Sequence, residues 1–343
     1  MKITIKKIAE EAGVSVTTVS NVINNKANRV SDEKKELINQ IIKKYDYSPN
    51  MNARALVQSS SHLIGLLYFS ERPRLDFTDP FVSEVLEGIE RVAKEKGFFT
   101  LIHNITSQQD IEDIQKNWKF DGLIAVGFNQ AFFELINESI SVPIVFIDTH
   151  IDERVYNNLH EYPDRYFLNT DDFNAAYKPT EYLIQKGHEQ IAFLSYDFDL
   201  TQSGVVQQRY IGYMSALNAH GIDVDEKLIF TEEDFDLLLS TSESFTAILV
   251  TADYLAMQLI HFLKENKIFY ERKISVIGFD DIKYAALNDP PLTTVRLDQL
   301  AKGQKAMEIL VSVIDGTKKD SEVFNLNSEL VIRKTVYEHK NKK

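Results

Sequence analysis

Hydrophobic positions change their spacing near residue 62. Before it they recur at helical intervals, and after it short apolar strands alternate with amphipathic helices. This alternation is typical of a mostly parallel sheet covered on both faces. The predicted strands are Leu63–Phe69, Thr100–Asn104, Gly122–Val126, Ile144–Ile147, Phe167–Thr170, Ile191–Leu194, Ala247–Val250 and Ile274–Gly278. The predicted helices are Phe81–Lys96, Gln108–Trp118, Phe173–Lys186, Gln207–His220, Tyr254–Asn266 and Leu297–Val313.

The start of the chain predicts two short helices joined by a corner. Ala9 and Ala12 are small enough for close packing, and Gly13 permits a left-handed turn. Ser15 fits the N-cap of the second helix. The inward stripe of this helix is Val19, Val22 and Ile23, and its outward face carries Thr17, Ser20, Asn21 and Asn24. The pattern favours a helix-turn-helix, although alone it would also fit a helical hairpin with a solvated polar face.

A third helix and a connector follow. Ser31, Asp32 and Glu33 supply a cap and two acids near the positive end of the helix dipole. Pro49 ends this helix, and the stretch from residue 50 to 58 can form one or two further turns that are marginal in isolation. Residues 59–61 are three serines, which predict a flexible connector.

Eight predicted strands exceed one ordinary doubly wound sheet, so two lobes are expected after residue 62. Acids follow several of these strands, where ligands of such sheets collect. Asp171 and Asp253 stand directly ahead of helices and are interpreted mainly as caps. Asp148 and Asp280 are ligand candidates. Arg209 is either a charge on the surface, or a guanidinium that donates paired hydrogen bonds to hydroxyls or to a carboxylate.

The composition limits the classes of function. The 343-residue chain has no cysteine, which excludes disulfides and thiol chemistry. No apolar run approaches the length of a bilayer span, and the N-terminus has no signal-peptide core, so a cytoplasmic protein is expected. Of the net charge of −13, residues 1–62 contribute +4 and the remainder −17. A basic head on an acidic body suits contact of the head with phosphate.

Catalytic motifs are missing from the sequence. It has no Gly-rich phosphate loop, dinucleotide fingerprint or nucleophile elbow, and His188-Glu189 lacks the second His of a zinc-protease helix. Asp171 and Asp172 are neighbours on a turn and are interpreted as caps rather than as a glycosidase pair. No enzyme activity, cofactor or metal is expected.

These features together resemble the LacI/GalR family of bacterial transcriptional repressors over nearly the whole chain. Each matching segment is weak alone, but the ordered set is specific. The segments are Ile5–Ala9, Ala12–Ser15, Thr18–Ser20, Arg29–Ser31, Tyr47–Asn50, Ala53–Leu56, Ile64–Leu66, Asp121–Ile124, Gly187–His188, Ile274–Asp281 and Pro290–Arg296.

The resemblance implies an all-α helix-turn-helix head, a hinge helix and a two-lobed α/β body like that of periplasmic binding proteins. The implied DNA-binding domain is 1–48, the hinge and linker 49–61, and the effector-binding and dimerisation domain 62–343. Within the body, the N-lobe is expected at about 62–155 and 292–320, and the C-lobe at about 156–291 and 321–339.

The resemblance also implies site residues. Val16, Thr17 and Asn21 would face bases, with Ser15, Thr18 and Ser20 near phosphate. Asn50, Ala53 and Leu56 would lie in the minor groove, where Leu56 would separate a base step and kink the duplex. The implied effector site consists of Phe81, Asp148, Arg209 and Asp280, with Phe230 as a stacking platform. These groups suit a sugar.

The implied function is a homodimeric repressor of sugar-utilisation genes that a saccharide inducer releases from operator DNA. Alternatives are a corepressor-dependent regulator, and a cytoplasmic sugar-binding protein with an incidental helical head. The chain departs from the family at Asn21, where many members have Arg, and at Ala252, where an Asn is common. Its C-terminal tail has no apolar heptad of a tetramerising helix.

Overall fold

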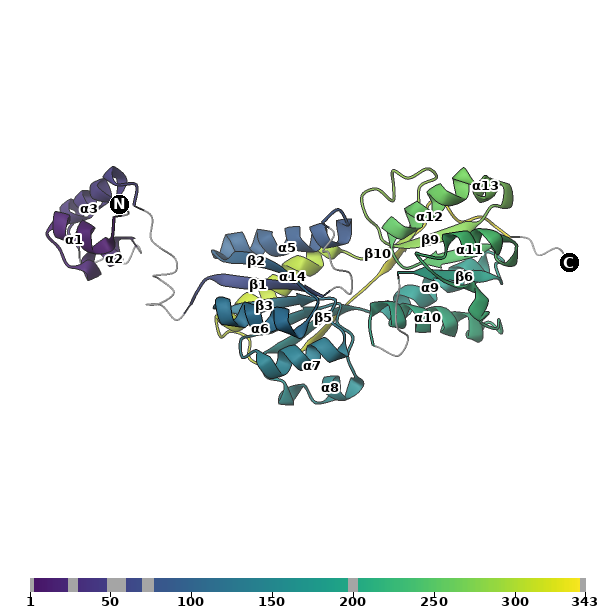
Figure 1. Cartoon of the computed structure of the whole chain (residues 1–343), viewed down its shortest axis with the longest axis horizontal. Helices are drawn as coiled ribbons and strands as arrows, with labels where there is room; N and C mark the ends of the chain where they lie inside the picture. Colours follow the sequence, from purple (N-terminus) through teal and green to yellow (C-terminus); the bar gives the residue numbers. More distant parts are fainter. Residues whose placement is uncertain (1–2, 24–29, 48–59, 70–76, 197–202, 340–343) are drawn as a thin grey trace. The chain divides into compact units, whose positions relative to one another are not determined.

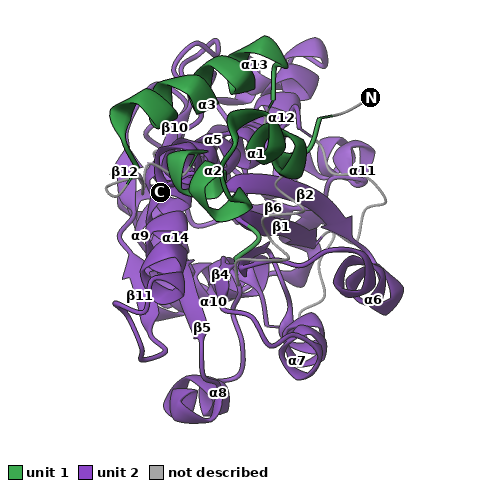
Figure 2. Ribbon diagram, turned by 90° about the vertical axis from the view of Figure 1, so that its left-hand side faces the viewer, with its two compact units in different colours: residues 1–61 green, residues 62–343 purple. Residues whose placement is uncertain are grey.

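The computed structural model describes residues 3–23, 30–47, 60–69, 77–196 and 203–339. The chain divides into two compact units, residues 1–61 and 62–343, which Figure 2 shows in different colours. None of the helices in the described ranges is long and apolar enough to cross a membrane.

Within its described residues, the first unit contains three helices, α1 (Ile5–Ala12), α2 (Val16–Ile23) and α3 (Asp32–Lys44). Gly13 ends α1 with a φ of 62°, the left-handed conformation that its lack of a side chain permits. All three helices contribute to one small core, which is formed by Ile8, Ala9, Ala12, Val19, Val22, Ile38 and Ile41. The predicted helix-turn-helix is therefore present, with a third helix that completes its core.

The second unit contains two six-stranded sheets (Figure 1). The N-lobe sheet has the order β11-β5-β4-β3-β1-β2, and its paired strands are all parallel. Its strands are β1 (Leu63–Phe69), β2 (Phe99–Ile105), β3 (Gly122–Val126), β4 (Ile144–Ile147), β5 (Arg165–Thr170) and β11 (Val323–Leu326). Its helices are α5 (Pro80–Lys96), α6 (Gln108–Asn117), α7 (Gln130–Ser139), α8 (Glu153–Asn157) and α14 (Gln299–Ile314). One hydrophobic core lies between the sheet and helices α5 and α14, and a second lies between the other face of the sheet and helices α6 and α7.

The C-lobe sheet has the order β12-β10-β9-β8-β6-β7, and β12 is antiparallel to β10. Its strands are β6 (Ile191–Ser195), β7 (Ile229–Thr231), β8 (Ala247–Val250), β9 (Ser275–Asp280), β10 (Thr293–Arg296) and β12 (Glu329–Val331). Its helices are α9 (Asp172–Gln185), α10 (Val205–Ala219), α11 (Phe235–Ser240), α12 (Asp253–Glu265) and α13 (Ile268–Arg272). Short 3₁₀ turns lie at Leu159–Glu161, Glu226–Leu228 and Ser242–Ser244. Cores on both sides again fill the space under the helices.

The strand pairing corrects the lobe boundaries expected from the sequence. β5 and β11 pair in the N-lobe sheet, although the expected boundaries placed 156–291 and 321–339 in the C-lobe. β10 pairs with β9 in the C-lobe sheet, although 292–320 was expected in the N-lobe. The physical reason is that the backbone N–H and C=O groups of β5, β10 and β11 need hydrogen-bond partners, which the neighbouring strands of these sheets supply. The chain therefore changes lobes after β5, after β10 and after β11.

Candidate nucleic-acid interface and ligand site

The start of α2 is held by Ser15. Its Oγ accepts a hydrogen bond from the backbone N of Thr18 at 3.1 Å, as the predicted N-cap requires, and lies 2.9 Å from the Oγ1 of Thr18. The backbone carbonyl of Ser15 also accepts from Thr18 and Val19. These bonds fix the direction in which α2 leaves the corner.

The predicted reading residues share the accessible face of α2. Val16 is 43% exposed and Thr17 is exposed, whereas Ser20 and Asn21 are half-buried. Positions four apart are neighbours on a helix, so Val16 lies beside Ser20 and Thr17 beside Asn21. Val19 and Val22 face the core instead. The helix thus presents small polar side chains of the kind that hydrogen-bond to base edges.

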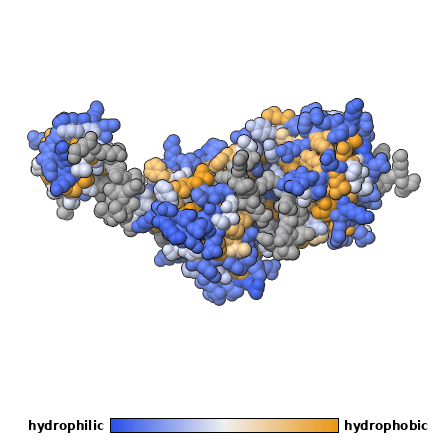
Figure 3. All heavy atoms as spheres, viewed as in Figure 1, coloured by the Kyte–Doolittle hydropathy of each residue, from blue (hydrophilic) through white to orange (hydrophobic). Residues whose placement is uncertain are grey.

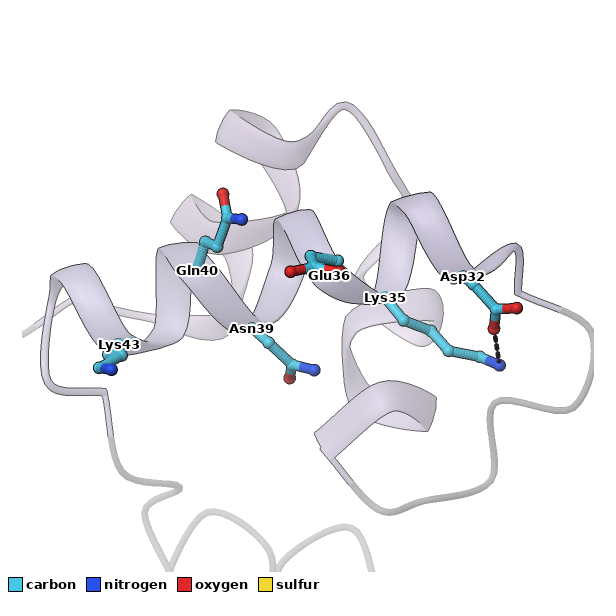
Figure 4. A pocket seen from close by; sticks show the side chains of 6 residues that line it. All are labelled: Asp32, Lys35, Glu36, Asn39, Gln40 and Lys43. Atoms are coloured by element: carbon cyan, nitrogen blue, oxygen red, sulfur yellow. Dashed lines mark hydrogen bonds and ion pairs between the residues drawn. The ribbon is translucent and has the colours of Figure 1, made fainter.

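The third helix carries mixed charge. A hollow of about 440 Å³ beside α3 is lined by six side chains of that helix, and an ion pair of 2.9 Å joins Asp32 to Lys35 (Figure 4). The other four lining residues are Glu36, Asn39, Gln40 and Lys43. Acids and bases balance there, so the hollow favours neither an anion nor a cation.

The hinge predictions at Asn50, Ala53 and Leu56 lie outside the described residues.

A buried ion pair lies at the carboxyl edge of the N-lobe sheet. Lys302 of α14 places its Nζ 2.7 Å and 2.9 Å from the two carboxylate oxygens of Asp148, which follows β4. The same Nζ donates to the Oγ1 of Thr170 at 2.9 Å, at the end of β5. Lys302 is 1% exposed and Asp148 is 8% exposed. Such a pair is maintained only because each charge has the other as its partner.

A second buried pair lies at the carboxyl edge of the C-lobe sheet. The Nε of Arg209 donates to the Oδ1 of Asp172 at 2.8 Å, and its Nη1 donates to the carbonyl of Thr251 at 2.6 Å. The guanidinium also lies 4.3 Å from the centre of the Phe279 ring. Burial raises the pKa of Asp172, but the charge of Arg209 and the hydrogen bond with His150 outweigh it and hold that pKa below the ordinary value.

Among the described residues, two side-chain contacts join the carboxyl edges of the lobes. His150, which follows β4 in the N-lobe, places its Nε2 2.8 Å from the Oδ2 of Asp172 in the C-lobe. Gln299, the first residue of α14, donates from Nε2 to the Oδ1 of Asp280 at 3.3 Å, at the end of β9. The two lobes therefore meet through polar groups at the edges where ligands of parallel sheets bind.

Close helix packing positions both ion pairs. A Cβ on Gly303 would meet the backbone carbonyl of Val85, so α14 lies directly against α5 beside Lys302. A Cβ on Gly212 would meet the carbonyl of Phe173, which brings α10 against α9 beside Arg209. Glycine is required in both places because any side chain would push the helices apart.

Three acids at these edges have strained backbones. The φ angles of Asp148, Asp280 and Asp281 are 49°, 102° and 55°. Such conformations cost about 1–3 kcal/mol each in residues other than glycine and gather at ligand sites. Burial raises the pKa of Asp280 to about 6, against the opposing charge of Arg209.

Asp171 and Asp253, both interpreted as caps, have different outcomes. The Oδ1 of Asp171 accepts from the backbone N of Asn174 at 3.1 Å and caps α9. Asp253 is instead fully buried inside the first turn of α12, and Ala252 occupies the cap position. Its carboxylate accepts from the backbone N of Ile282 and from the Oγ1 of Thr294. Burial raises its pKa well above the ordinary range.

The two aromatic predictions have different outcomes. Phe81 lies at the start of α5, half-buried against the N-lobe core, so part of its ring remains accessible. Phe230 is 1% exposed and packs inside the C-lobe core, with its ring centre 6.2 Å from that of Phe245. The prediction that Phe230 is a stacking platform is therefore wrong, because the core encloses the ring.

Four residues that complete these edges were not predicted from the sequence as parts of a site. Asp172 was interpreted as a cap, and His150, Gln299 and Lys302 were not singled out. A usable signal existed for Lys302, since a lysine on the apolar side of an otherwise hydrophobic helix needs a buried partner.

Comparison with known proteins now identifies the family. The model "Bacterial regulatory proteins, lacI family" matches residues 4–50, and "Periplasmic binding protein-like domain" matches 180–336. The HTH-type transcriptional repressor PurR of Vibrio atlanticus is 31% identical over 348 residues, which cover 97% of this chain and 98% of the relative. The chain belongs to the lacI family of bacterial regulatory proteins.

Other proteins similar to this lacI-family regulator are transcriptional regulators as well. The HTH-type transcriptional regulator RegA of Clostridium saccharobutylicum is 28% identical over 349 residues, covering 98% of this chain and 99% of the relative. The Lac repressor dimer bound to operator and the anti-inducer ONPF has a TM-score of 0.80 at 22% identity, covering 98% of this chain and 100% of that chain. A transcriptional regulator CelR–cellobiose complex has a TM-score of 0.69 at 22% identity, covering 97% and 99%. The two structures confirm the fold.

Proposed function

We propose that this lacI-family regulator is a cytoplasmic homodimeric repressor of sugar-utilisation genes, and that a saccharide inducer releases it from its operator. The observation that carries the proposal is the meeting of the two carboxyl edges through His150 with Asp172 and Gln299 with Asp280. A ligand bound between these edges would change both contacts, and with them the relative position of the lobes.

The DNA-reading role is assigned to the face of α2. Val16, Thr17 and Asn21 contact bases, and Ser15, Thr18 and Ser20 lie near phosphate. This assignment is supported by the exposure of Val16 and Thr17 at the start of the helix, the part that enters a major groove in helix-turn-helix proteins. Asn50, Ala53 and Leu56 act in the minor groove at the centre of the operator.

The effector role is assigned to Asp148, Arg209 and Asp280, with Phe81 at the mouth of the site. A guanidinium and several carboxylates match the paired hydroxyls of a sugar. Binding of the inducer then lowers the affinity for the operator, and binding of the operator lowers the affinity for the inducer by the same factor.

The homodimer is supported by an apolar edge of the N-lobe. β2 is an edge strand of its sheet and exposes Phe99 at 59% and Ile102 at 40%. The surface seen in Figure 3 is mostly hydrophilic, with hydrophobic residues in separate patches. Apolar side chains on an edge strand, which pairs with a neighbour on one side only, favour association with another chain.

Selection of binding sites from random DNA with the full-length protein tests this proposal. A homodimer with two α2 helices should select two inverted half-sites about one helical turn or a multiple of it apart. Recovery of no preferred sequence, or of a single half-site without symmetry, would contradict the proposed mode of binding.

A further inference from the structure

Two of the proposed effector residues lie in different lobes. Asp148 follows β4 of the N-lobe, and Arg209 lies on α10 of the C-lobe. One ligand can contact both residues only when the two lobes stand at a fixed separation. A short chain of bonds joins the two residues. His150 is two positions after Asp148, and its Nε2 lies 2.8 Å from the Oδ2 of Asp172. The Oδ1 of Asp172 in turn accepts from the Nε of Arg209 at 2.8 Å.

The backbone on both sides of His150 is fixed within the N-lobe. The N–H of Thr149 donates to the Oδ1 of Asn169 at 2.9 Å, and its carbonyl accepts from the Nδ2 of the same side chain at 3.0 Å. The hydroxyl of Tyr156 donates to that carbonyl at 3.0 Å and accepts from the N–H of Ile151 at 3.3 Å. Thr149 and Asn169 are buried. His150 is therefore held in place and cannot follow its partner if the lobes move apart.

Asp172 is fixed in the same way within the C-lobe. Its side chain is fully buried, and its partner Arg209 donates to the carbonyl of Thr251 at 2.6 Å and packs over the ring of Phe279. A carboxylate paired with a guanidinium only accepts hydrogen bonds, so the Nε2 of His150 must carry the hydrogen. If the lobes part, a buried carboxylate oxygen loses this donor, which is unfavourable.

The other contact between the lobe edges is longer. The Nε2 of Gln299 lies 3.3 Å from the Oδ1 of Asp280, just beyond the usual range of about 2.7–3.2 Å for such a bond. The contact of His150 with Asp172 is 2.8 Å long, within that range, and it is made to a carboxylate that is more deeply buried. Of the two contacts, that of His150 therefore contributes more to holding the edges together.

We propose that His150 is a positioning residue of the effector site. Its Nε2–H holds the carboxylate of Asp172 in the other lobe, and thereby fixes the distance between Asp148 and Arg209. The inference rests on the proposed effector role of these last two residues. It gives His150 a role that requires no contact with the ligand, because His150 acts through Asp172.

Distances between spin labels in the full-length protein test this role directly. The chain has no cysteine, so two introduced cysteines provide the labelling sites. Glu138→Cys on α7 of the N-lobe and Asn218→Cys on α10 of the C-lobe both replace exposed residues. Double electron–electron resonance measures the distance between the labels, and dilution with unlabelled protein restricts the measured pairs to single chains. This readout needs neither ligand nor DNA.

Variants of His150 provide the comparison. His150→Leu removes the donor and should shift the distance between the labels by about 2 Å or more. His150→Asn is polar but too short to reach Asp172, so it should shift the distance as well. His150→Gln places an amide N–H about as far from the backbone as the Nε2–H and should restore the wild-type distance.

His160→Leu is the matched control, because the His160 side chain is 76% exposed in the N-lobe, and it should change nothing. An unchanged distance in His150→Leu and His150→Asn would overturn the positioning role. A shift that His150→Gln does not restore would overturn it too, since the role requires only the donated hydrogen bond.

Operator binding separates this inference from the proposed function. If the arrangement of the lobes controls DNA binding, fluorescence anisotropy with the selected DNA should show operator affinity changed about fivefold or more in His150→Leu and unchanged in His150→Gln. A shifted label distance with unchanged operator affinity would refute the proposed function and leave the positioning role intact. An unchanged label distance would refute the positioning role, whatever the operator affinity.

Discussion

The Nζ of Lys302 lies within 2.9 Å of both carboxylate oxygens of Asp148, across 154 positions of sequence. Lys302 lies on α14 and Asp148 at the end of β4, so the pair joins a late helix of the N-lobe to the centre of its sheet. Disrupting this ion pair therefore tests how α14 is attached to the carboxyl edge of the N-lobe sheet.

Removing one partner of this pair should be costly. Lys302→Met leaves a buried carboxylate without its cation, and should lower the free energy of unfolding by about 3–5 kcal/mol. Urea unfolding measures this. The double variant Lys302→Met with Asp148→Asn should recover part of the loss, because asparagine tolerates the positive φ and carries no charge. Additive losses in the double variant would show that the two groups do not act as a pair.

The pKa of Asp280 predicts a pH dependence. Burial raises that pKa to about 6 in the folded chain, above its value near 3.9 when unfolded. The folded state then binds more protons between these values, so this group's contribution to stability is fully present below about pH 4 and is lost as pH rises through about 6. Asp280→Asn should make the free energy of unfolding less dependent on pH in that window. An unchanged slope contradicts the raised pKa.

Asn21 should set one base of the half-site. Asparagine bonds adenine bidentately, whereas arginine favours guanine. Selection from random DNA should therefore give different preferred bases for wild type and Asn21→Arg at the position facing residue 21. Glu10→Arg also adds positive charge at an exposed position of α1 and should leave the preferred bases unchanged. The same base preference in wild type and Asn21→Arg would defeat the assignment.

Leu56 should matter for operator binding alone. In the proposed role it separates a base step, so Leu56→Ala should weaken operator affinity about tenfold or more while ligand affinity stays unchanged. Fluorescence anisotropy measures the first quantity and isothermal titration the second. Unchanged operator affinity would remove Leu56 from the hinge assignment.

The fold could be predicted where the signals were local. Gly13 and Ser15 mark the corner of the helix-turn-helix, and strands such as β4, buried at every position, stand out as continuous apolar runs. β7, β10, β11 and β12 are three or four residues long and, unlike β4, are not buried at every position, so no continuous apolar run marks them. β10 reads Thr-Thr-Val-Arg, in which only pairing with β9 and β12 reveals a strand.

The site was predictable only in part. Asp148 directly follows β4, Asp280 ends β9 and Arg209 lies near the start of α10, where position along the chain suggests a role. Lys302 and Gln299 lie inside a helix, and their partners come from other elements of the fold. Asp172 looked like a cap because its cation, Arg209, is 37 positions away. Sequence patterns report neighbours along the chain and not these contacts.

The most direct test of the account is operator affinity as a function of ligand. Anisotropy of labelled operator DNA with full-length protein should show affinity falling as an inducing sugar is added, by about 5–150-fold at saturation. Affinity that rises with sugar would favour corepression, and affinity that does not change would contradict the central claim that the lobe edges control DNA binding.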